Sequence, residues 1–276
     1  MTETICDLPA LAAMIPDGAK LAVPSENCGV AMAATRELIR RRVRGLHLVC
    51  VPVSGLQADI MIGAGLVATI ETSAVTMGEF GSAPRFVSAV REGKLRILDA
   101  TCPAIHAALQ AGQKGIPFIP LRGLIGSDVL ANRPDWKLIA NPFQADDPIV
   151  VLPAIRPDVA LFHAPLADRY GNVFIGRWRE LLTMAHAARE TLVTVEEFTD
   201  GDLMDDPDRS PGVLPALYVT RIAHAPRGAW PLRFGGDYEM DEPALSRYMA
   251  AAQTEEGFRR FLSEWLDEPA PAGAVA

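Results

Sequence analysis

The stretch Leu46-His47-Leu48-Val49-Cys50-Val51 is an almost unbroken apolar run, and it follows a segment with helical spacing over residues 29–42. A short apolar run of this kind is typical of a strand that is buried on both faces. Such strands, when they alternate with helices, predict a parallel sheet with a layer of helices on each side. We therefore expect an open, mostly parallel α/β fold with helices on both faces.

The same alternation of strands and helices continues along most of the chain. Further strands are predicted over residues 20–23, 59–65, 67–71, 95–98, 149–152, 159–163, 191–195 and 217–219. Further helices are predicted over residues 84–91, 103–111, 179–189, 243–252 and 255–266. Because no repeat or low-complexity linker interrupts the pattern, we expect one domain over residues 1–267 and a disordered tail over residues 268–276.

The bulk composition excludes several classes of partner. The chain has 276 residues, a formal net charge of −8 and 49% hydrophobic residues, so it lacks the basic surface that non-specific nucleic-acid binding requires. Its longest basic run, Arg40-Arg41-Arg42-Val43-Arg44, closes a predicted helix, and we interpret it as a solvated helix end rather than a phosphate site. No apolar stretch approaches the roughly 20 residues that span a bilayer, and residues 1–9 do not resemble a signal peptide. We expect a cytoplasmic protein that binds neither nucleic acid nor membrane.

Familiar single-chain catalytic signatures are absent from the sequence. It contains no nucleophile elbow, phosphate-binding loop or zinc-protease motif, and Gly63-Ala64-Gly65 lacks the third glycine of a dinucleotide site. The four cysteines are widely spaced, which favours reduced thiols. The five histidines are equally scattered, so we expect no metal site.

Five sequence blocks, taken together, indicate a protein family more specifically than any one block does. They are LQADIMIGAGLV at residues 56–67, GEFG at 78–81, GIPFIPLRG at 115–123 with GSD at 126–128, PDVALFHA at 157–164 and ADRYGNV at 167–173. In this order and spacing the blocks resemble the A-type chain of class I coenzyme A transferases, of the glutaconate CoA-transferase type. The resemblance extends over about residues 17–248.

The resemblance implies a reaction and a partner. In the family, a glutamate carboxylate attacks the thioester carbonyl of an acyl-CoA, and CoA becomes bound to that glutamate as a thioester. A second carboxylic acid then takes the CoA from the glutamate. That glutamate and most CoA contacts belong to a B-type subunit, so the resemblance implies that the catalytic glutamate is not in this chain. It also implies that coenzyme A is a substrate and that no cofactor is tightly bound.

One loop departs from the family pattern. Family A-type chains have a Gly-Gly-Phe loop after the first strand, whereas this chain has Pro24-Ser25-Glu26-Asn27-Cys28-Gly29. The triplet Ser25-Glu26-Asn27 is similar to the motif around the B-type nucleophile. We interpret it as a coincidence or as a helix N-cap made by Ser25 or Asn27, and a relocated nucleophile at Glu26 is the alternative.

Three further residues are candidates for substrate binding. Glu79 lies in a glycine-flanked loop, where it borders the acyl pocket or the subunit interface, or else caps the helix near Pro84 or is solvated. Arg122 follows a buried-looking segment and could clamp a substrate carboxylate, or else pair with Asp128 or with a carboxylate of the interface. Ser127 could donate to a carboxylate or make a turn hydrogen bond.

The remaining polar candidates have a structural interpretation. Cys102 begins a helix and His106 lies one turn later, yet we expect a buried thiol rather than a catalytic pair. His163 ends a strand and is expected to be partly buried with its hydrogen bonds satisfied. Asp168 and Asn172 bracket a hairpin-like turn, where such side chains bind the backbone.

Three functions are consistent with the sequence. The resemblance favours transfer of CoA between an acyl-CoA and a carboxylic acid by a complex with a B-type subunit. The altered loop at residues 24–29 leaves open a hydrolase of CoA thioesters, including a ring-cleaving one, on the same scaffold. A non-catalytic scaffold subunit is the third possibility, because the chain has no certain nucleophile of its own.

Overall fold

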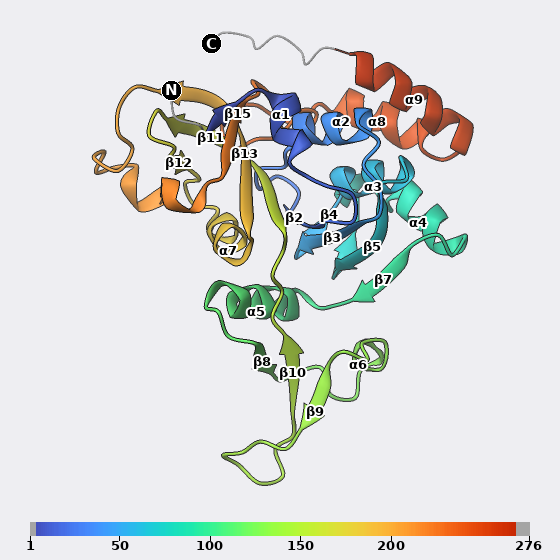
Figure 1. Ribbon diagram of the computed structural model, residues 1–276. Coiled ribbons are helices and arrows are strands. Elements are labelled where there is room, and N and C mark those ends of the chain that lie inside the picture. Colours follow the sequence, from blue (N-terminus) through green and yellow to red (C-terminus); the bar gives the residue numbers. More distant parts are fainter. Residues whose placement is uncertain (1–3, 269–276) are drawn as a thin grey trace.

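A ten-stranded sheet forms the centre of the computed structural model, which describes residues 4–268 (Figure 1). Eight strands follow one another across it in the order β1, β15, β13, β11, β2, β3, β5, β7, and every neighbouring pair in this path is parallel. Their bounds are β1 (Ile5–Cys6), β2 (Lys20–Pro24), β3 (Leu46–Val51), β5 (Val67–Thr72), β7 (Arg96–Asp99), β11 (Val159–Asp168), β13 (Glu190–Thr199) and β15 (Arg221–His224). The short strands β12 (Val173–Phe174) and β14 (Val213–Leu214) add antiparallel pairs beside β11. The predicted open, mostly parallel sheet is confirmed.

Each face of the sheet has its own hydrophobic core because alternate residues of a strand point in opposite directions. In β3, Leu46, Leu48 and Cys50 belong to one core, while Val49 and Val51 belong to the other. The first core is covered by α1 (Leu8–Ala13), α2 (Met32–Arg40), α3 (Leu56–Gly63), α4 (Pro84–Arg91), α8 (Glu242–Ala251) and α9 (Glu255–Asp267). The second is covered by α5 (Cys102–Gln113) and α7 (Arg179–Ala187). This is why the strand sequences are apolar without alternation.

The strand order reverses between β2 and β11. From β2 the chain proceeds through β3, β5 and β7 toward one edge of the sheet. Strands β11, β13 and β15 follow one another toward the other edge. In open α/β sheets, ligands bind outside the carboxyl ends of the strands at such a reversal. The loop that follows β2 therefore lies where a site is expected.

Residues 116–153 form an arm that hangs beneath α5 in Figure 1. It contains a three-stranded antiparallel sheet of β8 (Phe118–Leu121), β10 (Ile149–Pro153) and β9 (Lys137–Ile139), together with the short helix α6 (Asp128–Ala131). Arg133 fastens the arm to the main sheet, since it donates to Glu71 on β5 over 2.9 Å and to the carbonyl of Asp99 on β7 over 3.1 Å. The predicted strand at 149–152 is confirmed as a strand, but it belongs to the arm.

The predicted strand over residues 59–65 is wrong, because this segment continues helix α3. The helix begins after Gly55 and is buried on nearly every side, with the Asp59 carboxylate fully enclosed. Asp59 accepts hydrogen bonds from the amide of Phe86 and the hydroxyl of Tyr248, which joins α3 to α4 and α8. A helix without a solvated face has no apolar stripe, and a short apolar run is then indistinguishable from a strand.

The predicted strand over residues 217–219 is also wrong. Residues Ala216–Tyr218 form a 3₁₀ turn, η3, in which Leu217 is 84% exposed, and the sheet resumes only at Arg221. Two further 3₁₀ turns are η1 (Gly78–Phe80) and η2 (Ser210–Gly212), and β4 (Val53–Ser54) pairs with β6 (Ala74–Val75).

The single-domain assignment stays a prediction, and the predicted tail lies outside the described residues from position 269 onward. Within residues 4–268, no helix is both long enough and apolar enough to cross a membrane.

Candidate functional site

The loop after β2 is held in place by its neighbours on both sides. The Ser25 hydroxyl donates to the carbonyl of Val51 at the end of β3, over 2.8 Å. The amide of His163 on β11 donates to the carbonyl of Gly29, over 2.7 Å. Helix α2 begins only after Ala31 and has no side-chain cap, so the predicted N-cap by Ser25 or Asn27 is wrong. The residue of this loop that could take part in a functional site is Glu26.

The Glu26 side chain reaches across to the start of α3. Its Oε2 and Oε1 atoms lie 3.2 and 3.4 Å from the amide nitrogen of Leu56. Burial raises the pKa of Glu26 to about 7, and the charge of Asp59 adds to this, although the amides of Leu56 and Gly55 oppose it. A carboxyl group with this pKa exchanges its proton readily near neutral pH.

A glycine makes room for this carboxyl group. A Cβ atom on Gly55 would lie 2.3 Å from Glu26 Oε2 and 2.6 Å from the carbonyl oxygen of Thr76, which is far closer than atoms can approach. Only glycine therefore allows the carboxyl group to rest against the first turn of α3. The amide groups there favour an anion, because they have no partner within the helix.

Glu26 lines a cavity of about 580 Å³. Its walls come from three separate segments: the loop after β2, the turn η1, and the chain between Arg233 and Leu245. Glu79 is exposed on η1 and lines the same cavity, while the helix α4 is capped by Ala83 rather than by Glu79. The structure thus brings Glu26 and Glu79 together. Within residues 4–268, no group of three His, Cys, Asp or Glu side chains is arranged to hold a metal ion.

The third wall of this cavity has no counterpart among the residues predicted from the sequence. Arg233, Glu239 and Glu242 supply its charged side chains, and Met240 and Leu245 supply apolar ones. These residues lie more than 200 positions from Glu26 in the sequence and follow no motif. The only sequence signal is the density of charged residues just before a predicted helix, which is also typical of an ordinary solvated turn.

Arg122 and Ser127 lie on the arm and line no part of the cavity that contains Glu26 and Glu79. The guanidinium of Arg122 pairs with Asp147 rather than with Asp128, and it borders an apolar groove of the arm. The Ser127 hydroxyl donates to the carbonyl of Leu124 over 2.7 Å, which is the turn hydrogen bond.

Cys102 forms no pair with His106, and Cys28 is not a poised nucleophile. Cys102 is exposed rather than buried, contrary to prediction, and its sulfur lies 3.2 Å from the Ser73 hydroxyl, not against His106. Burial, together with the charge of Glu180, raises the pKa of Cys28 to about 12, so this thiol stays protonated at neutral pH.

His163, Asp168 and Asn172 make the hydrogen bonds predicted for them, although His163 was expected to be only partly buried. His163 is completely buried, and its ring nitrogens lie 2.8 Å from the Thr194 hydroxyl and 2.7 Å from the Glu196 carboxylate. Asp168 closes the turn after β11 by accepting from the amide of Asn172 over 2.9 Å.

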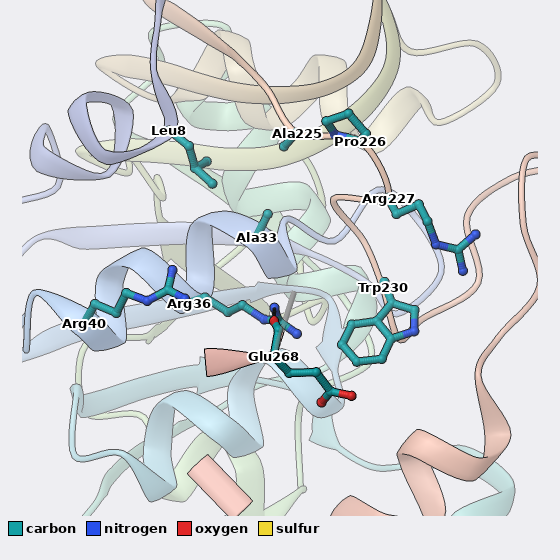
Figure 2. Close-up of a pocket in the computed structure, with 9 residues that line it drawn as sticks. All are labelled: Leu8, Ala33, Arg36, Arg40, Ala225, Pro226, Arg227, Trp230 and Glu268. Carbon is teal, nitrogen blue, oxygen red and sulfur yellow. Dashed lines mark hydrogen bonds between the residues drawn. The ribbon is translucent and has the colours of Figure 1, made fainter. Parts of the chain in front are cut away.

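A second cavity, of about 250 Å³, shares no lining residue with the first (Figure 2). Arg36 and Arg40 extend into it from α2, and Figure 2 shows Trp230 and Glu268 beside Arg36. The guanidinium of Arg36 lies 5.1 Å from the ring centre of Trp230 and 4.4 Å from that of Trp265, and it donates to the Glu268 carbonyl over 2.7 Å. Arg36 therefore joins α2 to the end of α9.

Comparison with known families decides what kind of protein carries this site. Residues 8–223 match the family model described as coenzyme A transferase. The chain belongs to the coenzyme A transferase family. It is similar to the A-type chain of 3-oxoadipate CoA-transferase from Pseudomonas knackmussii, with 32% identity over 96% of this chain and 94% of the relative. The predicted identity as the A-type chain of a CoA-transferase is confirmed.

Two solved structures share the architecture of this CoA-transferase chain. Glutaconate coenzyme A-transferase from Acidaminococcus fermentans superimposes with a TM-score of 0.88 at 27% identity, covering 96% of this chain and 89% of that one. The decarboxylase AibA/AibB superimposes with a TM-score of 0.84 at 32% identity, covering 97% of this chain and 100% of the other. The fold predicted for the CoA-transferase type is confirmed.

The role of Gly55 in this CoA-transferase chain can be tested by a substitution that adds one methyl group. Gly55→Ala is expected to displace the Glu26 carboxyl group and lower kcat/KM of the complete enzyme by about 10- to 100-fold. Stability should fall as well, by about 1–3 kcal/mol, because the added Cβ would lie 2.6 Å from the backbone carbonyl oxygen of Thr76 and the ψ of −112° at this position lies outside the regions that alanine prefers. Steady-state kinetics and urea denaturation measure the two effects.

Gly236→Ala is the matched control for this substitution. Apart from its chain neighbours, no atom of the described residues lies within 4 Å of the position of its added Cβ. It is expected to leave both quantities nearly unchanged. Full activity in Gly55→Ala would show that the position of the Glu26 carboxyl group does not matter to the reaction.

Proposed function

We propose that this chain transfers CoA between an acyl-CoA and a carboxylic acid as one half of a complex with a B-type subunit. In this proposal the attacking glutamate belongs to the partner. The chain itself contributes the cavity beside Glu26 and Glu79, which holds the acyl part of the substrate. The resemblance of the sequence to A-type chains and the A-type relative found by comparison support this proposal, in which the partner provides the nucleophile and this chain provides the cavity.

The proposed chemistry moves acyl and CoA groups without oxidation or reduction. A carboxylate oxygen of the partner's glutamate attacks the thioester carbon, the C–S bond breaks, and the CoA thiolate leaves behind a mixed anhydride. The thiolate then attacks the glutamyl carbon and releases the first carboxylic acid as its anion. A second carboxylate reverses both steps, so that the glutamate is regenerated and one thioester replaces another.

The position of the cavity is the observation that carries this proposal. It lies at the loop after β2, beside the reversal of strand order, where α/β sheets bind ligands. Within the described residues, its side chains include no cysteine, histidine or lysine, and its partly buried carboxyl group rests against backbone amides rather than a base. Such a pocket holds a substrate, and a nucleophile from a partner completes it.

The experiment that tests the proposal locates the covalent intermediate. The chain is purified alone and with its B-type subunit, each is incubated with acyl-CoA, and hydroxylamine is added to convert a glutamyl thioester to a hydroxamate. Peptide mass spectrometry then identifies the labelled residue. We expect CoA exchange only in the complex, with the label on a glutamate of the partner.

Two results would overturn the assignment of the nucleophile. The first is CoA exchange by the chain alone. The second is a hydroxamate on Glu26, abolished by Glu26→Ala, which would mean that the Ser25-Glu26-Asn27 triplet is a functional nucleophile motif.

A different reaction on the same scaffold is the second candidate. The similarity to a decarboxylase over the whole chain favours it, and the proton-carrying Glu26 carboxyl group is suited to protonate a carbanion. Release of CO₂ from a carboxylated acyl-CoA, without any acid acceptor, would establish decarboxylation. Release of free CoA under the same conditions would establish hydrolysis.

A further inference from the structure

The cavity beside Glu26 is rich in negative charge. Among the described residues, carboxyl side chains line it from Glu26, Glu79, Glu239 and Glu242, against a single guanidinium, from Arg233. That guanidinium lies 3.4 Å from the carboxylate of Glu239 and is therefore already partly neutralised. A ligand that enters the cavity meets acceptors far more often than donors.

Glu26 differs from the other three carboxyl groups. Glu79, Glu239 and Glu242 are all exposed, whereas Glu26 is partly buried in the loop after β2. Its side-chain hydrogen bonds come from the Leu56 amide, and it makes no ion pair with any residue between positions 4 and 268. The carboxyl group has acceptor capacity left over, since a carboxylate offers about four lone-pair sites.

The rest of the wall suits an aliphatic chain. Met77 and Leu245 are almost fully buried and Phe80 and Met240 are partly so, and all four line the cavity. A volume of about 580 Å³ accommodates an acyl chain of several carbons. The pocket therefore combines apolar sides with an acceptor at Glu26.

We propose that Glu26 determines which acyl chain the pocket admits, and that it selects a chain ending in an uncharged hydrogen-bond donor, such as a hydroxyl group, over one ending in a second carboxylate. This inference rests on the proposed function, in which the cavity holds the acyl part. A terminal hydroxyl donates to the Glu26 carboxylate. A terminal carboxylate would stand among like charges, and the described residues of the cavity wall offer it no cation beyond the already paired Arg233.

The expected size of the preference follows from hydrogen bonds to charged groups. Such a bond favours its ligand by about 10- to 100-fold. Repulsion between carboxylates in a partly buried pocket adds to the same preference, because the effective dielectric constant there is below that of water. The chemistry of the transfer is unchanged between the two ligands, since the reacting carboxyl group lies at the other end of each molecule.

The preference should depend on pH in a defined direction. Burial raises the pKa of Glu26 to about 7, so the group is mostly charged at pH 8 and mostly neutral at pH 6. The titratable and charged groups around it are Asp59 on α3, Tyr248 and Glu242 on α8, Glu79 on η1, and Arg233 and Glu239 on the segment before α8. Burial raises the pKa of Asp59 as well.

The test compares two acids of equal length in the purified complex of the chain and its B-type partner. 5-Hydroxyvalerate and glutarate differ only in a terminal hydroxymethyl group against a terminal carboxylate. Both compete as acceptors from one acyl-CoA donor, and the ratio of their kcat/KM values is measured at pH 6 and pH 8. We expect 5-hydroxyvalerate to be preferred at least tenfold at pH 8 and less at pH 6.

Glu26→Gln gives the decisive comparison. The amide keeps the size of the side chain but removes its charge, so we expect the use of glutarate to rise, the ratio to fall at least tenfold, and its dependence on pH to disappear. A structural role alone would lower both rates together and leave the ratio unchanged. Glu92→Gln, at an exposed position at the end of α4, is the matched control and should leave the ratio unaffected.

The inference is overturned if the unaltered complex prefers glutarate, or if Glu26→Gln leaves the ratio as it was. A complex that transfers CoA to no acid would overturn the proposed function instead. In that event, saturation-transfer NMR with the same two acids measures their binding directly, and equal binding, or tighter binding of glutarate, would overturn the selectivity by itself.

Discussion

Replacing Arg133 with alanine is expected to lower the free energy of unfolding by about 3–5 kcal/mol, as is typical when one partner of a buried ion pair is removed. The side chains of Arg133 and Glu71 are each only 4% exposed, and their charged atoms lie 2.9 Å apart. Without Arg133, the Glu71 carboxylate keeps only Lys20 and His47, each at 3.4 Å. The arm also loses its hydrogen bond to β7. Urea denaturation of the purified chain at pH 7 measures the change.

The control for this substitution is Arg122→Ala on the same arm. The Arg122 side chain is 66% exposed and pairs with Asp147, so its removal should cost less than about 1 kcal/mol. If Arg133→Ala cost no more than Arg122→Ala, the buried pair would not be what fastens the arm to the sheet.

The contribution of Glu71 should also depend on pH. Burial alone would raise its pKa, but contact with His47 and the charges of Lys20 and Arg133 outweigh burial and hold the pKa at about 2. A carboxyl group whose pKa is lowered by folding stabilises the protein above its ordinary value of 4.5, and this stability is lost as the pH falls toward 2. The difference between the original protein and Arg133→Ala should therefore shrink below about pH 4.5.

Gly29→Ala is expected to be the most damaging single-methyl change in the loop after β2. Gly29 has a φ of +82°, which costs an alanine about 1–2 kcal/mol. Its added Cβ would also lie 2.3 Å from the carbonyl oxygen of His163, and overpacking of this kind costs about 1–3 kcal/mol more. Because the loop carries Glu26, we expect activity of the complex to fall about 100-fold as well.

Gly18→Ala separates the cost of a positive φ from the cost of the contact with His163. Gly18 has nearly the same φ, +77°, but apart from its chain neighbours no atom between residues 4 and 268 lies within 4 Å of the position of its Cβ. It should show only the backbone cost of about 1–2 kcal/mol. Equal loss of stability in the two variants, measured by urea denaturation, would mean that the contact with His163 adds nothing.

Much of the fold was readable from local sequence because its segments satisfy local rules. The run at 46–51 became β3, and residues 84–91 became α4, which begins at a proline and ends just before a glycine. Helix α3 was misread because no face of it is solvated, so its sequence carries no helical period. The arm was not foreseen, since short antiparallel strands of a projecting sheet look like any other strands in sequence.

The candidate site was only half visible for a related reason. Glu26 and Glu79 stand out in sequence because one lies in an unusual loop and the other between glycines. Arg122 and Ser127 belonged to the same set of recognisable blocks, yet they lie on the arm and not in the cavity with Glu26. The residues around Arg233 were missed because only folding brings them to Glu26.

By itself, the sequence indicated the family and the parallel sheet, and it singled out Glu26 and Glu79 as candidates without placing them in one cavity. Those properties depend on residue type and on spacing over short distances, which a chain displays before it folds. Tertiary structure alone decided that Glu26 rests against α3, that Gly55 makes space for it, and that acidic residues from the far end of the chain surround it. Charge environment and pKa depend on the distances between side chains, and those distances exist only once the sheet has assembled.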